Sequence, residues 1–68
     1  DGTRDLGSSL LQWQNVYTAD LNLNNTSSDG NDVDGTTGHW TIQEGEDNLF
    51  LLNRGTGKQY KFSLEEIK

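Results

Sequence analysis

Three stretches of this chain alternate apolar with polar residues, a pattern typical of β-strands that bury one side and expose the other. They are YTADLNL at 17–23, HWTIQE at 39–44 and KQYKFSL at 58–64, and a short apolar run, LFLL, lies between the last two at 49–52. No window of eleven residues sustains the period of a helix. The pattern therefore predicts an all-β fold.

Glycine-containing segments separate these stretches. The sequences EGED at 44–47 and NRGTGK at 53–58 place glycines where tight hairpins need a positive φ. Residues 39–68 are therefore predicted to form a three-stranded antiparallel meander with a short tail. Residues 1–23 supply a turn and the first strand, and residues 24–38 form a long polar loop rich in Asn, Asp, Ser, Thr and Gly. We expect one domain.

The apolar content is too low for a self-sufficient core. Leu, Ile, Val and Phe together make up 15 of the 68 residues, and chains this short rarely gain enough stability from one core. Small domains usually compensate with disulfides, a structural metal or association. Because the chain has no cysteine and one histidine, we expect the β-meander to be completed by packing between subunits of a homo-oligomer.

The same alternation selects the residues that should form the core or the subunit interface. Trp40 and Tyr60 fall in register with Ile42 and Phe62, as expected of residues that share one side of a sheet. The predicted core and interface residues are Trp13, Tyr17, Leu21, Leu23, Trp40, Ile42, Leu49, Leu51, Tyr60 and Phe62.

The net charge of −6 argues against nucleic acid as a partner, because nucleic-acid binding needs clustered Lys and Arg, and the five basic residues here are scattered. No apolar run approaches the length of a membrane span, and no signal-peptide pattern opens the chain. We therefore expect neither nucleic-acid binding nor membrane insertion.

The polar loop holds the first candidate for binding. Asp29, Asp32 and Asp34 lie within six residues, and carboxylates this close repel one another unless a cation or solvent screens them. An EF-hand is excluded because Thr36 stands where the bidentate Glu should be. The three aspartates remain candidates for a weak cation site or a receptor contact, beside the simpler interpretation of a solvated loop.

The other candidate chemistry is weaker. The sequence GTGK at 55–58 lacks the first Gly and the final Ser or Thr of a phosphate-binding loop and fits a hairpin turn. His39 has no Ser, Cys or second His nearby in sequence with which to form a catalytic or metal site. Glu44, Glu46 and Asp47 could serve glycoside chemistry only over a cleft, which a chain this small hardly offers. We expect no enzyme activity, no cofactor and no metal centre.

The segment RDLGSSLLQWQNVYTADLNL resembles a recurrent segment of bacteriophage tail-fibre proteins, of the form D-L-G-S-S-x-x-R-W-x-x-[VI]-Y. The second half, GHWTIQEGEDNLFLLNRGTGKQYKFSLEEI, is similar to a segment that often follows it in fibres of marine and cyanobacterial phages. Together the two segments span nearly the whole chain. One departure is Gln12, where the family commonly has Arg before the Trp, so an ion pair of that Arg is not expected here.

The resemblance implies an elongated homotrimer near the receptor-binding end of a fibre, in a virion and outside cells. Its partners would be further copies of the chain, other fibre proteins and a glycan or protein on the host surface. The family often continues into a self-cleaving chaperone domain, whose signature is absent from this sequence. Two alternatives stay open: a carbohydrate-binding or glycan-processing module that uses Trp40, Tyr60 and the turn at 44–47, and a subunit of a cellular extracellular filament.

Overall fold

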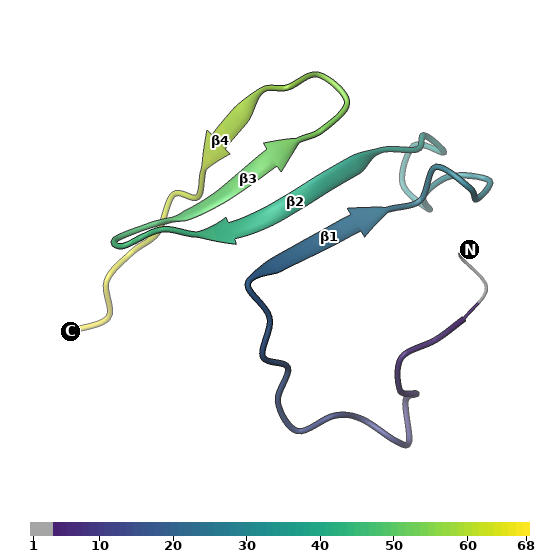
Figure 1. The fold of residues 1–68 in the computed structure, drawn as a ribbon, viewed down its shortest axis with the longest axis horizontal. Helices are drawn as coiled ribbons and strands as arrows, with labels where there is room; N and C mark the ends of the chain where they lie inside the picture. The colour runs from purple at the N-terminus through teal and green to yellow at the C-terminus, as the bar shows by residue number, and fades with distance from the viewer. Residues whose placement is uncertain (1–3) are drawn as a thin grey trace.

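The computed structural model describes residues 4–68, which form one open four-stranded antiparallel sheet (Figure 1). The strands are β1 (Asp20–Asn24), β2 (His39–Glu44), β3 (Leu49–Asn53) and β4 (Gln59–Lys61), and each pairs with its neighbour in the chain. The predicted all-β antiparallel meander with a long polar loop is confirmed. Residues 1–3 of the predicted N-terminal segment lie outside the described residues.

The described chain contains no helix that is long and apolar enough to cross a membrane. Its regular structure consists of the four strands alone, and the remaining residues form turns and irregular segments.

The strand register assigns every second residue to the same side of the sheet. Leu21 pairs with Ile42, and Ile42 in turn pairs with Leu51, so these three residues share one side. Thr41 pairs with Asn22 on one neighbour and with Leu52 on the other, and these residues lie on the opposite side. One side is therefore apolar and the other is mainly polar.

The sheet has no second layer, and the described chain has no buried hydrophobic residue. The chain exposes 6547 Å² of surface, whereas a folded monomer of its mass exposes about 4,300 Å². Its radius of gyration is 14.6 Å, compared with about 11 Å for a compact domain of this length. As a single copy the chain is thus far more open than a domain that packs its own core.

β1 begins later than the sequence predicts. The alternation starts at Tyr17, but the first paired residue is Asp20, opposite Gln43. In the same register Tyr17 would lie opposite Glu46, where the chain has already left β2 to make a turn. The predicted strand over residues 17–23 is wrong at its N-terminal end: Tyr17 and Thr18 lie beyond the end of β2, and the chain bends at Ala19.

β4 is also shorter than predicted. The Phe62 amide donates a hydrogen bond to the Leu49 carbonyl (3.0 Å), which extends the pairing by one residue. Leu49 is the first residue of β3, so Leu64 has no strand beside it and its side chain is 63% exposed. The alternation of apolar and polar residues in KQYKFSL therefore continues beyond the end of β4.

The two hairpin turns use glycine for different reasons. Gly57 has a φ of 80°, as predicted for the turn at 53–58. Gly45 is not among the residues with positive φ, so the prediction for the turn at 44–47 is wrong on this point. A Cβ at Gly45 would lie 2.7 Å from a ring carbon of Phe50, so this glycine makes room for an aromatic ring.

The most buried side chain is polar. Thr41 is completely buried on the polar side of the central strand β2. Its hydroxyl donates to Asn22 Oδ1 (2.6 Å) and accepts from Arg54 Nε (3.0 Å). Because a buried hydroxyl is costly without partners, these bonds link β1, β2 and the β3–β4 turn in one register.

Candidate functional site

The main candidate site is the apolar side of the sheet, here called the apolar face. The register places on it eight of the predicted interface residues, which come from all four strands and the residue that follows β4. They are Leu21, Leu23, Trp40, Ile42, Leu49, Leu51, Tyr60 and Phe62.

The side chains of this face remain accessible. Leu21 and Leu23 in the edge strand are 47% and 49% exposed, and Tyr60 at the other edge is 47% exposed. Ile42 and Leu51, in the two central strands, are half-buried by their neighbours. An apolar surface that runs across a whole sheet is unusual on an isolated soluble domain and is typical of an interaction site.

Two aromatic rings form the widest part of the apolar face. The ring centroids of Trp40 and Tyr60 are 5.8 Å apart, with an angle of 36° between the planes. This is the range in which aromatic pairs attract each other. The tilt means that the two rings do not form one flat platform on which a sugar could stack.

Two predicted interface residues lie outside the sheet. Trp13 and Tyr17 belong to the segment that precedes β1, and their side chains are 62% and 92% exposed. In Figure 1 this segment leaves the sheet at the start of β1 and then curves back, and it pairs with no strand. The structure does not bring these two residues together with the apolar face of their own chain.

The polar loop, residues 25–38, is closed at its base by Asn25. The Asn25 amide donates to the Gly38 carbonyl (3.2 Å), and the Gly38 amide donates to Asn25 Oδ1 (2.7 Å). The loop lies at one end of the sheet, beyond the C-terminus of β1 and the start of β2 (Figure 1). Its position is therefore set by the β1–β2 pair.

Asn31 organises the inside of this loop. Its Nδ2 donates to Asp34 Oδ1 (2.8 Å) and to the Thr36 carbonyl (2.9 Å). Its Oδ1 accepts the amides of Val33 (2.7 Å) and Asp34 (2.9 Å). The Asn31 side chain thus supplies hydrogen bonds in place of backbone pairing for much of the loop. This role of Asn31 was not predicted from the sequence, although a segment rich in Asn, Asp and Gly favours turns closed by side-chain oxygens.

Hydrogen bonds lower the pKa of Asp34. The largest cause is the bond from Asn31, followed by bonds from the Thr36 hydroxyl (2.8 Å) and the Thr36 amide (3.1 Å) to Oδ1. Each bond favours the ionised carboxylate over the neutral acid. Asp34 therefore acts in the structure as an acceptor that holds the loop together.

We expect the order of the loop to depend on this ionisation. Since the pKa of Asp34 is lower in the folded loop than in the unfolded chain, its contribution is present above the unfolded pKa and is lost as pH falls through the folded one. An NMR titration of the Asp34 carboxyl carbon should give a pKa below the usual value for Asp. In Asn31→Ala the pKa should move up toward that value, and an ordinary pKa in the native chain would contradict the assignment.

The three loop aspartates do not form a metal cage. Among residues 4–68, no group of three His, Asp or Glu side chains could hold a metal ion. One oxygen of Asp34 is also occupied by the loop itself. The geometry gives no support to a cation site built from Asp29, Asp32 and Asp34, whereas their role in contacting a receptor stays a prediction.

The turn that contains GTGK is held by hydrogen bonds between its own residues. Asn53 Oδ1 accepts the amides of Gly55 (2.9 Å) and Thr56 (3.2 Å), and the Asn53 carbonyl accepts the amide of Gly57 (2.8 Å). The Lys58 amide donates to Thr56 Oγ1 (3.2 Å). The backbone amides that would cradle a phosphate already have partners, as a hairpin turn requires.

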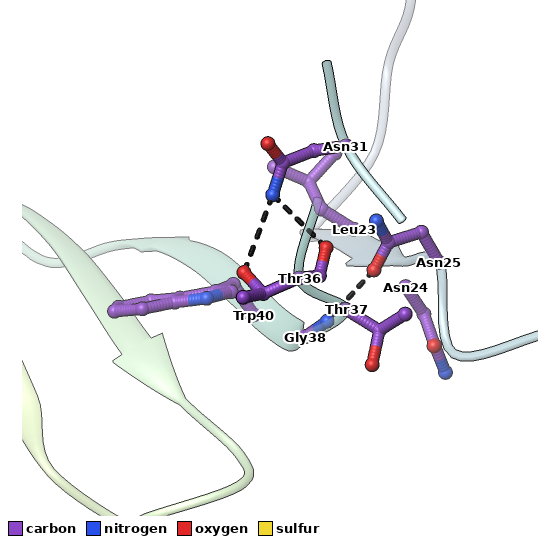
Figure 2. Close-up of a pocket in the computed structure, with 8 residues that line it drawn as sticks. All are labelled: Leu23, Asn24, Asn25, Asn31, Thr36, Thr37, Gly38 and Trp40. Carbon is purple, nitrogen blue, oxygen red and sulfur yellow. Dashed lines mark hydrogen bonds between the residues drawn. The ribbon is translucent and has the colours of Figure 1, made fainter. Parts of the chain in front are cut away.

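An open recess of about 430 Å³ lies where the loop meets the apolar face (Figure 2). Leu23 and Trp40 contribute its apolar lining, and the side chains of Asn31 and Thr36 approach from the loop. The remaining lining residues are Asn24, Asn25, Thr37 and Gly38. The recess makes the loop and the apolar face one continuous surface at this end of the sheet.

The aromatic residues and the carboxylates that a glycan-processing module would use lie apart from each other. Trp40 is near the start of β2, and the turn with Glu46 and Asp47 follows its end. Trp40 and Glu44 lie four positions apart along the strand, a distance of about 13 Å. His39 opens the same strand and lies on the polar side, opposite Asn24. The structure therefore brings the aromatic rings together with each other but not with the carboxylates.

Comparison of the chain with protein-family models, with curated proteins and with solved structures found no match.

Proposed function

We propose that this chain is a structural, non-enzymatic module that works as a homotrimer in a phage tail fibre or a related virion appendage, outside the cell. The observation that carries the proposal is the apolar face, which nothing in residues 4–68 covers. The sequence resemblance to tail-fibre segments supports the trimer and the fibre. Other fibre proteins would be its further partners.

The size of the uncovered surface fits association between copies. The surface exceeds that of a compact monomer of equal mass by roughly 2,200 Å², which is ample for the contribution of one chain to an obligate interface. Association of identical chains places the same apolar face of every copy around one axis. Burial of this face supplies the hydrophobic stabilisation that a single sheet lacks.

The loop at 25–38 suits contact with the host surface. It carries Asp29, Asp32 and Asp34 at one end of the sheet, and Val33 between the last two is 95% exposed. Loops held on a rigid scaffold commonly carry binding residues. Attachment to a host glycan or protein through this loop is the second part of the proposal.

Sedimentation of the purified chain tests the assembly. At micromolar concentration we expect a closed species of three times the 7.6-kDa chain mass, with a melting temperature that rises with concentration. A folded monomer with concentration-independent melting would refute the proposal. Growth into open polymers without a limiting mass would favour the extracellular-filament alternative.

A further inference from the structure

The segment before β1, residues 4–19, is here called the arm. It leaves the sheet at the N-terminal end of β1 and then curves back on itself without pairing with any strand (Figure 1). Its large apolar side chains are the most exposed in the chain outside the loop and the tail. The exposed fractions are 78% for Leu6, 91% for Leu10, 78% for Leu11, 62% for Trp13, 66% for Val16 and 92% for Tyr17.

The arm has local order of its own. The Ser8 amide donates to the Leu11 carbonyl (3.0 Å), and the Leu11 amide donates to Ser8 Oγ (3.0 Å). Gly7 adopts a φ of 84°, and a Cβ there would lie 3.4 Å from the indole of Trp13. This turn fixes Trp13 against Gly7, so the arm presents its aromatic residue in a defined place.

Most of the arm is the longest uncharged stretch of the chain. Residues 6–19 contain no Asp, Glu, Lys or Arg, although 16 of the 68 residues are charged. Charged residues are depleted at the centre of protein interfaces, where aromatic residues are enriched. The lack of charge and the aromatic residues Trp13 and Tyr17 fit the centre of an interface, yet these two side chains are 62% and 92% exposed.

The arm does not lie over the apolar face of its own sheet. The chain bends at Ala19, directly before β1, and on the other side of this bend the arm leaves the sheet (Figure 1). Trp13 and Tyr17, at 62% and 92% exposure, are therefore not covered by the face of the same copy. Thr18 Oγ1 donates to the Asp20 carbonyl (2.9 Å) and helps to fix the chain where it enters β1.

We infer that the arm packs on the apolar face of a neighbouring copy, with Trp13 as its anchor, so that arms exchanged between copies hold the oligomer together. This inference rests on the proposed function. The uncharged stretch at 6–19 matches the centre of the apolar face, where Leu21, Ile42 and Leu51 lie. A recess of about 160 Å³ offers a place for one of its side chains; Leu21, Ile42 and Leu49 line its apolar part, and Thr18, Ala19, Gln43 and Glu44 form its rim.

Photo-crosslinking of the full chain tests the exchange. Trp13 is replaced by the photoreactive aromatic residue p-benzoylphenylalanine, and this chain is unfolded and refolded with an excess of ¹⁵N-labelled native chain. After irradiation we expect crosslinks from the unlabelled arm to ¹⁵N-labelled peptides of β1 to β3. The same photoreactive residue at Val33, which is 95% exposed in the loop, is the control and should give none to those strands. Crosslinks only within one chain, or only between arms, would overturn the inference.

A matched pair of substitutions gives a second readout. Trp13→Ser should raise the dissociation constant of the oligomer by about 30-fold or more, the effect of losing an interface anchor. Leu64→Ser removes an apolar side chain of similar exposure, 63%, and should change the constant by less than about 2-fold. If both variants assemble like the native chain, the arm is not the partner, although assembly through the face still stands. If the native chain itself is a monomer, the proposed function fails as well.

Discussion

Replacing Ile42 with Asp is expected to abolish assembly at micromolar concentration. Ile42 lies in the central strand β2, between Leu21 and Leu51 on the apolar face. A carboxylate there would be buried against apolar side chains of other copies, with no cation to pair with. Burial of an unpaired charge costs several kcal/mol, and we expect assembly to weaken by at least about 100-fold.

Sedimentation velocity measures this change, and circular dichroism of the same sample follows the strand content. Gln59→Asp is the matched control, because it adds the same charge on the polar side of β4, opposite Leu52. This variant should assemble like the native chain. A trimer that survives Ile42→Asp with unchanged mass would place the subunit contacts on another surface.

Replacing Gly30 with Ala is expected to disrupt the loop. Gly30 has a φ of 113°, a region that residues with a Cβ rarely adopt. The added methyl would collide with the carbonyl of Gly35, whose carbon lies 2.6 Å from the Cβ position. Strain and collision together should cost the loop about 3 kcal/mol or more, so its local structure should be lost.

Hydrogen exchange of the Asn31 amide, which donates to the Thr36 carbonyl (3.0 Å), reports this loss directly. Gly35→Ala is the control, because Gly35 also has a positive φ, 75°, but its Cβ would meet nothing within 4 Å. The control should lose only about 1 kcal/mol. Since the loop lies outside the apolar face, Gly30→Ala should leave the oligomer mass unchanged; dissociation would show that the loop takes part in assembly.

The apolar face could be predicted from the sequence. The alternation of apolar and polar residues shows which residues of a strand share a side, and strand pairing places the apolar sides of neighbouring strands together. Once three strands follow one another through short turns, antiparallel pairing forces Ile42, Leu51 and Tyr60 onto the same side. The ends of the strands were not predictable in this way. Tyr17 and Leu64 continue the alternation, but a strand needs a partner, and the turns decide where the partner ends.

Contacts between residues that are distant in the sequence could not be predicted either. Thr41 and Arg54 lie 13 residues apart, and neither has a local pattern that indicates a shared hydrogen bond. The same holds for Asn25 and Gly38, which close the loop from its two ends. By contrast, the turn around Asn53 follows from local composition, since an Asn side chain followed by two glycines commonly bonds the amides after it.

The order β1-β2-β3-β4 also sets the sequence of events as the chain folds. Only four residues join β2 to β3 and five join β3 to β4, whereas fourteen join β1 to β2. Closing the longer connection costs about 1 kcal/mol more in chain entropy than closing the shortest one. The two hairpins therefore form first, within microseconds for such local elements, and β1 joins last. The apolar face becomes complete only at that step, and because a single sheet has no buried hydrophobic residue to hold it, the addition of β1 and the encounter between copies stabilise each other.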